Sequence, residues 1–407
     1  MRTRLFGLVT VLFLSNPVSG DITVPGADGS DGAFNPATNV TINLALAPTG
    51  TWNGPNSSPG NGVYDPDKWA VVFRYSSVNI ASGRTVTFSS HPSGAPVIWL
   101  LNGPVTIAGT LDVSSRKIAG IGNNTFLGFE LPGPGGFRGA GSNTTGGLGP
   151  GGTDSGSHAS YGTGTRAYGN SRVVPLIGGS GAGSSGNYGE AGGGAILIAA
   201  TSLVTLNGAV RANASVDSFG PPLNPGGSGG AIRMICDSLS GTGQLRATPT
   251  GSATGGSNKG RIRIEINQGG IASSDPAYSQ GVVGSIAQLW PEDVVADSPS
   301  TRVVSLGSNN VPTDPQASFE FPYADVNTAT SGAQTLVIEC KNIPTGLDPI
   351  GVQAWNVKAR IVPRSGTVQN ITASYVSGDY SLSTWEAQVT LPTGFSAIQV
   401  RASMPPQ

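Results

Sequence analysis

A pattern of apolar and polar residues repeats along this chain. Residues 97–113 align at constant offset with residues 196–212: an apolar run, a polar break, then Val-Thr-aliphatic, a small turn and a second alternating stretch. A third copy lies at residues 231–247, and partial copies lie at 78–88 and 261–266. An internal repeat of this kind is typical of architectures in which each unit buries its apolar face only against the next unit.

The repeat predicts short strands that stack. Each copy offers two or three alternating stretches of about five residues, too few to bury a face alone. Stacking pairs every strand with its counterpart in the next copy, and Gly-Thr and Asn-Gly pairs supply the turns between strands. A sandwich of two sheets does not need the same turn residues at the same place in each unit. We therefore expect an all-β fold whose core is a right-handed parallel β-helix (a solenoid) over residues 66–273.

Residues 118–193 interrupt this repeat with a glycine-rich insertion. Glycine makes up 62 of the 407 residues of the chain and is concentrated here, without the strict Gly-X-Y period of collagen. Two interpretations remain open: a flexible excursion, or left-handed extended segments that pack closely because glycine has no side chain. Spaced aromatic residues in the insertion favour a folded, loop-rich flap.

A different pattern begins near residue 274. Residues 274–300 contain Pro276, Trp290-Pro291 and Pro299 and are predicted to form a linker. From residue 301 to 407, about seven short alternating stretches are separated by turn sequences such as Pro392-Thr393-Gly394. Seven short strands in roughly 100 residues predict an immunoglobulin-like β-sandwich.

The N-terminus predicts export. Residues 1–20 combine a basic start, a short apolar run and a small-residue exit, as in a secretory signal peptide. The apolar run is shorter than the about 20 residues needed to span a bilayer, so we expect no integral membrane anchor. Residues 21–65 are predicted to form a strand and a cap. Localisation is accordingly expected to be secreted, extracellular or at the cell surface, with Cys236 and Cys340 favoured as buried thiols over a disulfide.

Composition excludes several kinds of partner. Charged residues are only 11% of the chain and the net charge is −1, which gives no electrostatic basis for binding nucleic acid. The only histidines, His91 and His158, stand alone in polar stretches. We therefore expect no metal site and no cofactor.

Catalysis has little support in the sequence. A secreted β-helix suggests a polysaccharide lyase or a glycoside hydrolase, which needs clustered carboxylates. Acids are sparse in the repeat region, and Asp112 is matched in the other copies by Arg211 and Arg246. An enzyme would require Asp154, Glu190 and Asp217 to converge with one of these arginines. We assign no catalytic residue.

Two pairs of residues are candidate glycan contacts. Arg211 and Arg246 fall at equivalent repeat positions, so stacking would align them in a basic column able to hold acidic glycans; the alternative is a pair of solvated arginines. Tyr161 and Tyr188, in the insertion, would serve a carbohydrate-binding protein if they lay on a flat exposed face.

Gly-Gly-Ala-Ile opens a strand at residues 193–196 and again at 229–232, and Val389-Thr390-Leu391-Pro392-Thr393-Gly394-Phe395 lies near the C-terminus. In these features the chain resembles glycine-rich β-helix proteins of bacterial cell surfaces that carry a C-terminal sandwich module. The resemblance implies export and a surface role and transfers no catalytic residues.

The predicted function is a secreted or cell-surface structural or adhesive protein without catalytic activity: a matrix component, a filament subunit or an adhesin. Its expected partners are polysaccharides or other cell-surface components, with self-assembly through open strand edges as a further expectation. The alternatives are a polysaccharide-active enzyme of β-helix type and a carbohydrate-binding protein.

Overall fold

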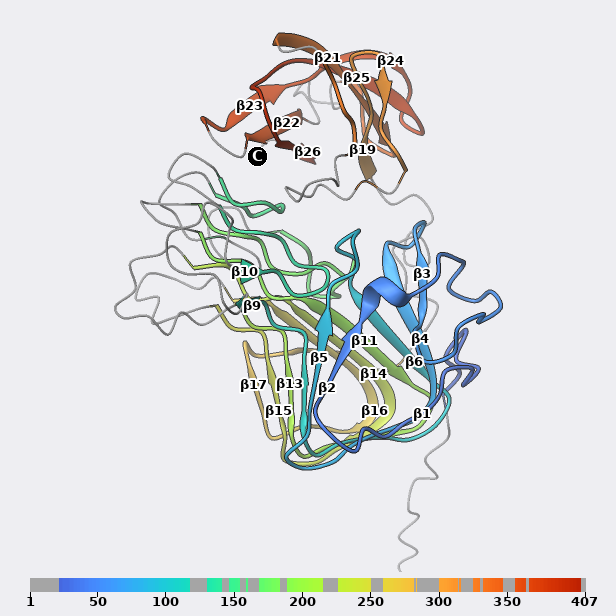
Figure 1. Ribbon diagram of the computed structural model, residues 1–407. Helices are drawn as coiled ribbons and strands as arrows, with labels where there is room; N and C mark the ends of the chain where they lie inside the picture. Colours follow the sequence, from blue (N-terminus) through green and yellow to red (C-terminus); the bar gives the residue numbers. More distant parts are fainter. Residues whose placement is uncertain are drawn as a thin grey trace, which may run out of the picture.

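The computed structural model is all-β, and the only helix among the residues that it describes is the three-residue 3-10 turn Leu44–Leu46 (Figure 1). The structure describes residues 22–117, 130–140, 146–153, 159, 168–183, 189–214, 226–249, 259–281, 283, 300–313, 315, 325–329, 332–346, 356–363 and 366–403. The predicted signal peptide and most of the predicted linker lie outside these residues. No helix in the described part of the chain is long and apolar enough to cross a membrane.

Two parallel sheets form the body of the protein. The larger one runs in the order β11 (Ala195–Ala200), β6 (Val97–Leu101), β4 (Ala70–Ile80), β7 (Val105–Ile107), β12 (Leu203–Leu206), β14 (Ala231–Ser240), β16 (Arg261–Gly269) and β18 (Ser279–Gly281), with β1 (Gly32–Phe34) and β3 (Val63–Asp65) beside β4. The smaller one runs β17 (Ser273–Asp275), β15 (Gln244–Arg246), β13 (Ala209–Arg211), β8 (Thr110–Asp112), β5 (Thr85–Ser89) and β2 (Val40–Asn43). A short pair, β9 (Arg116–Lys117) with β10 (Glu130–Leu131), lies apart.

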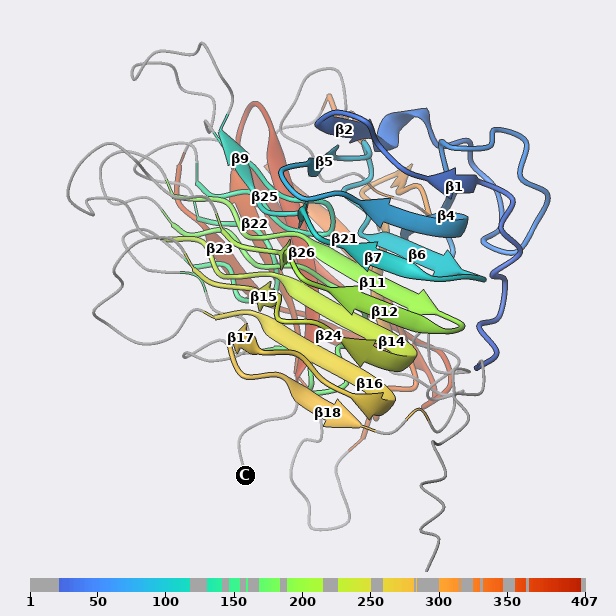
Figure 2. The ribbon, with the colours of Figure 1, turned by 90° about the horizontal axis from the view of Figure 1, so that it is seen from below.

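Aligned copies of the sequence repeat are neighbouring strands. Val97 pairs with Ile196, Val105 with Val204 and Leu111 with Val210, all in parallel. Figure 2 shows the strands of the successive copies side by side. The repeat therefore specified the partners of these strands and their register.

The predicted fold class is nevertheless wrong. Strand pairing does not describe an open right-handed β-helix: it runs β11-β6-β4-β7-β12-β14 and returns to β11, a closed parallel β-barrel of six strands. The closure comes from β4 and β14. These two long strands continue through the position where the other copies break into two strands, at Asn102-Gly103 and at Thr201-Ser202, so each pairs with both halves of its neighbour.

Alternate side chains of these strands fill one core. Phe73, Trp99, Ile198, Met234 and Ile264 are consecutive partners across the larger sheet, and all are fully buried. Because residues two apart on a strand face the same side, one apolar residue per pair of positions is enough to build this interior. Cys236 is part of the same core as a free thiol.

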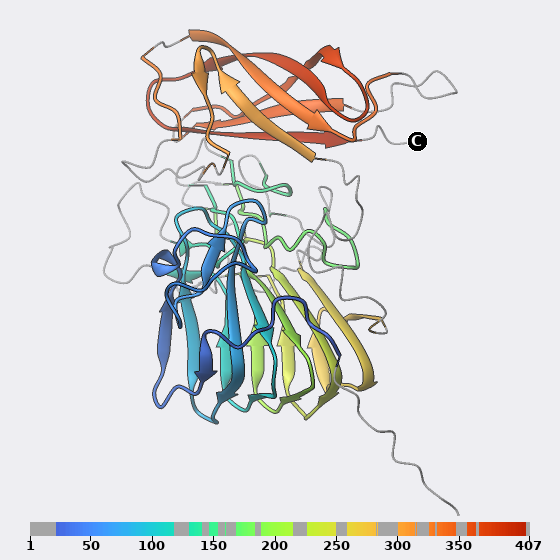
Figure 3. The same cartoon turned by 90° about the vertical axis from the view of Figure 1, so that its right-hand side faces the viewer.

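The opposite face of the larger sheet is also apolar, and an N-terminal segment covers it. Ile98 and Leu197 belong to a second buried cluster with Val24, against which Trp52 packs. The backbone N–H of Ile22 donates to the carbonyl of Thr201 at 2.7 Å. Figure 3 shows this segment crossing the strands. The region predicted as a cap therefore lies along a sheet face as well as over the end of the core.

The described parts of the glycine-rich insertion are packed extended segments. Backbone hydrogen bonds join three of these segments to one another. The Phe137 N–H donates to Gly179 O (3.0 Å), the Gly179 N–H to Gly193 O (2.7 Å) and the Gly192 N–H to Phe137 O (2.9 Å). A Cβ at Gly181 would collide with the carbonyl oxygen of Arg138. Close backbone approach, which only glycine allows at such positions, is therefore what organises these segments.

Two antiparallel sheets make up the C-terminal part, above the glycine-rich segments in Figure 3. One runs β20 (Asn309–Asn310), β19 (Ser300–Leu306), β21 (Gly332–Lys341), β25 (Ser383–Leu391) and β24 (Ser374–Gly378); the other runs β23 (Gln369–Thr372), β22 (Asn356–Pro363) and β26 (Ser396–Ser403). Both contribute to one core, which includes the free thiol of Cys340. The two sheets have five and three strands. The simplest immunoglobulin arrangement, which the sequence predicted, has sheets of four and three strands.

Candidate functional site

The candidate site is the outward face of the smaller parallel sheet. Along this sheet Val86, Leu111, Val210 and Leu245 are partners in register, and all are buried in the core. The residues on either side of them must face outward, because side chains alternate along a strand. The outward positions carry mainly threonine, glutamine, aspartate and arginine, which gives a polar surface.

Arg211 and Arg246 are direct partners on the neighbouring strands β13 and β15. Adjacent strands are about 4.8 Å apart, so the two guanidinium groups rise from neighbouring points of one surface. Both residues are exposed. Within the described part of the chain, neither side chain forms a hydrogen bond or an ion pair. The predicted column is therefore present and has its donors available to a ligand.

A carboxylate lies at each end of this arginine pair. Asp112 is the partner of Arg211 on β8, and Asp275 is the partner of Arg246 on β17. Lys259 Nζ lies 2.6 Å from Asp275 Oδ1, which neutralises that end. Asp112 accepts the backbone N–H of Ser114 at 2.9 Å. Arg116 also interacts electrostatically with Asp112. The two exposed arginines therefore lie between two carboxylates, each of which has a further cation nearby.

These carboxylates are too far apart for glycosidase chemistry. Asp112 and Asp275 are separated by three strand spacings, about 14 Å, whereas paired acids in glycoside hydrolases lie about 5–9.5 Å apart. Among the described residues no group of three His, Cys, Asp or Glu side chains could hold a metal ion. The face presents donors for an anion and no acid–base pair.

Hydroxyl groups extend the polar surface beyond the charges. Thr87 is the partner of Asp112 on β5, and its hydroxyl is 2.8 Å from that of Thr41 on β2. Gln244 lies two residues before Arg246 on the same outward side of β15 and is exposed. Amide and hydroxyl groups of this kind can bond the hydroxyl groups of a sugar.

Most of the other predicted site residues lie outside the described part of the chain. Tyr161 and Tyr188, the second pair of candidate glycan contacts, are among them, as are Asp154 and Asp217. Glu190 is described and is 5% exposed, within the glycine-rich segments. The convergence of these acids that an enzyme would require therefore stays a prediction.

Comparison with known proteins does not assign this chain to a family. No family model, no characterised protein and no solved structure matches this chain. The likeness to glycine-rich cell-surface proteins consequently rests on the sequence motifs alone.

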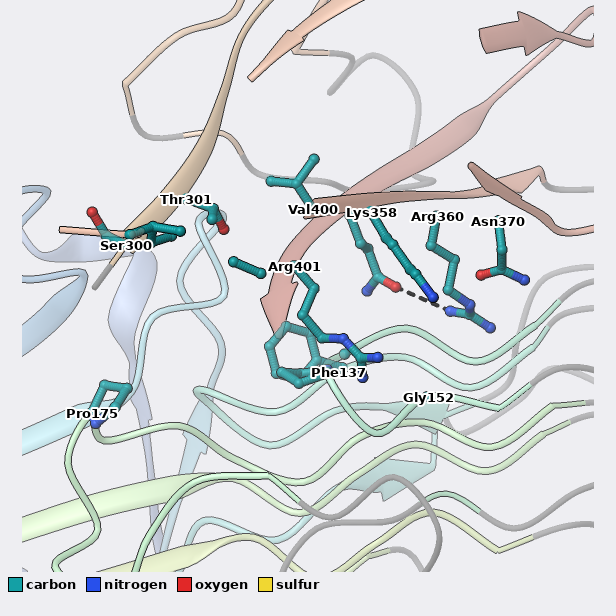
Figure 4. A pocket seen from close by; sticks show the side chains of 15 residues that line it. Phe137, Gly152, Pro175, Ser300, Thr301, Lys358, Arg360, Asn370, Val400 and Arg401 are labelled. Carbon is teal, nitrogen blue, oxygen red and sulfur yellow. Dashed lines mark hydrogen bonds between the residues drawn. The ribbon is translucent and has the colours of Figure 1, made fainter. Parts of the chain in front are cut away.

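A second basic site was not predicted from the sequence. Lys358, Arg360 and Arg401 line a cavity between the three-stranded C-terminal sheet and the glycine-rich segments (Figure 4). The signal available in the sequence was the alternation of Lys358 and Arg360 with buried Val357, Ala359 and Ile361. Alternation places the cations on the outer face of a strand, but it does not show which part of the protein packs against that face.

Proposed function

We propose that the protein is a secreted or cell-surface structural and adhesive protein that binds acidic polysaccharide without cleaving it. The observation that carries this proposal is the pair Arg211 and Arg246: exposed, in register on adjacent strands, and without partners in the described residues. Arginine presents a planar fork of donors that matches a carboxylate, so two such forks side by side suit two carboxylates of one polymer.

The geometry of the face suits a polymer better than a small molecule. The polar positions of this face continue from Thr41 through the arginine pair to Asp275 along the direction in which the strands stack. Small ligands usually bind in concave sites that bury most of their surface. A chain lying across several strands can instead combine many weak contacts.

Asp112 supplies selectivity, since Asp275 is already paired with Lys259. A uniformly and densely charged polyanion would bring a negative group against Asp112, which is unfavourable. A polysaccharide with carboxylates at intervals can place two of them on the arginines and place neutral hydroxyl groups beside the acids. We therefore favour a uronate-containing polysaccharide over a highly sulfated one.

The test is an incubation of the purified protein with polygalacturonate, alginate, a densely sulfated polysaccharide and neutral dextran, with and without Ca²⁺. Each polymer is then assayed for co-sedimentation with the protein and for new reducing ends or unsaturated products. We expect the uronate polymers to be retained intact, and more strongly than dextran. Product release would overturn the non-catalytic proposal, and equal retention of dextran would overturn its basis in charge.

A further inference from the structure

A contact between distant parts of the chain forms the second basic site. Leu148, in the glycine-rich segments, packs against Val362 and Ala397 on the outer face of the three-stranded sheet. Arg360 on the same face donates from Nη1 to the carbonyl of Gly147 at 2.7 Å. Beside these contacts the surfaces separate and leave a cavity of about 730 Å³. Ligand sites in proteins are commonly about 300–1,000 Å³.

The charge in this cavity is of one sign. Lys358 and Arg401 are partners in register on β22 and β26, and Arg360 lies two residues further along β22. No aspartate or glutamate is among the described residues that line the cavity. Three cations with no carboxylate among the described lining residues favour the binding of an anion.

Two of the three cations are available to such a ligand. Arg360 is occupied by the carbonyl of Gly147 and by Oε1 of Gln399 at 3.0 Å, the contact drawn as a dashed line in Figure 4. Lys358 and Arg401 are exposed and form no hydrogen bond or ion pair within the described chain. Arg360 therefore positions the wall of the cavity, while Lys358 and Arg401 supply donors.

The remaining lining is suited to a sugar ring. Phe137, Pro150, Pro175 and Val400 present apolar surface, against which the C–H face of a pyranose can pack. Asn370 and Thr301 offer amide and hydroxyl groups in the same cavity. An anionic group together with an apolar ring face and several hydroxyl groups describes an acidic sugar.

We infer that this cavity is a separate binding site for a short acidic oligosaccharide, or the end of a longer one, with its carboxylate held between Lys358 and Arg401. The site is independent of the arginine pair on the smaller parallel sheet. Because it is a cavity of about 730 Å³, it selects for chain ends and short chains.

The test uses trigalacturonate and its methyl ester, which differ in charge but not in ring structure. Binding is measured by isothermal titration calorimetry on the full chain. We expect the free acid to bind at least about tenfold more tightly than the ester, since charge-assisted hydrogen bonds to Lys and Arg are lost on esterification. Equal affinities for the acid and the ester, or no binding of either, would overturn the inference.

Variants locate the site. The double variant K358Q/R401Q is expected to lose about tenfold or more in affinity for trigalacturonate. The control K341Q/R84Q removes two exposed cations that do not line the cavity, and it should bind like the parent protein. A folded K358Q/R401Q protein with unchanged affinity would contradict the assignment; R401K, which keeps the charge, serves as the second variant if the double one does not fold.

R211Q/R246Q separates this inference from the proposed function. If trigalacturonate binds in the cavity, R211Q/R246Q binds it normally even when the same variant no longer retains polygalacturonate. Loss of trigalacturonate binding in R211Q/R246Q, with K358Q/R401Q unaffected, would place the short ligand on the sheet face and overturn the cavity site. Normal trigalacturonate binding with no retention of any polymer would refute the proposed function alone.

Discussion

Arg233 and Glu265 form a buried ion pair on the outer side of the larger parallel sheet, with Arg233 Nη2 3.0 Å from Glu265 Oε1. Their side chains are 2% and 10% exposed. Burial lowers the pKa of Arg233, and the Glu265 carboxylate acts against that shift. Arg263 Nε also lies 3.3 Å from the same oxygen, so one carboxylate compensates two guanidinium groups.

E265Q should therefore destabilise the body of the protein by about 3–5 kcal/mol, because it removes the carboxylate that is paired with a buried guanidinium group. The matched control is E339Q, which removes the exposed ion pair of Arg302 and Glu339 (2.9 Å) and should cost at most about 1 kcal/mol. Urea-induced unfolding followed by fluorescence measures both. Equal losses of unfolding free energy in the two variants would show that the buried ion pair contributes no more to stability than the exposed one.

Much of the strand pairing in the body was predictable from the sequence. Aligning residues 97–113 with 196–212 gives the register found in the structure. The third copy, residues 231–247, gives the pairing of Arg211 and Arg246. Local alternation and turn residues carry that information. The barrel closure was not predictable in the same way, because it depends on β4 and β14 remaining extended through a position where the other copies turn.

The cavity site could not be found from sequence for a different reason. Lys358 and Arg401 lie more than 200 residues from Gly147 and Leu148, and nothing in either segment encodes the other as its neighbour. The sheet face that carries the cations is recognisable from its alternation, but the docking of glycine-rich segments onto it depends on backbone carbonyls that every residue possesses.

Packing of the glycine-rich segments can be tested with alanine. G181A places a methyl group against the carbonyl of Arg138 and should destabilise the protein by about 2 kcal/mol or more, as other forced backbone shifts do. G270A is the control, since a Cβ there meets nothing within 4 Å. Thermal unfolding of both variants checks the prediction. A G181A protein as stable as G270A would mean that the segments are not closely packed.

Docking of the C-terminal sheets onto these segments depends in part on Arg360. R360Q removes the hydrogen bond to the Gly147 carbonyl and should weaken the contact by about 1–2 kcal/mol. Faster limited proteolysis between the two parts is the expected sign, with the unfolding of each part little changed. R302Q, which alters an exposed pair away from this contact, is the control; equal proteolysis of both variants would contradict the assignment.

Both cysteine thiols should resist modification in the native protein. Burial raises the pKa of Cys236 to about 12 and that of Cys340 to about 11, from 9.0. The neutral thiols therefore favour the folded state. Their contribution to the free energy of unfolding is fully present below pH 9 and is lost as the pH rises towards 11 and 12. We expect no reaction with a thiol reagent at pH 8 without denaturant, and two thiols per chain in urea. Stoichiometric labelling of the native protein would contradict this.

We propose that the paired arginines of the smaller parallel sheet hold an acidic polysaccharide. The most direct test compares the affinity of the parent protein and of R211Q/R246Q for polygalacturonate at low salt, with K341Q/R302Q on the C-terminal sheet as the control for lost surface charge. We predict a loss of about tenfold or more for R211Q/R246Q and little change for the control. Equal affinity in all three proteins would contradict it.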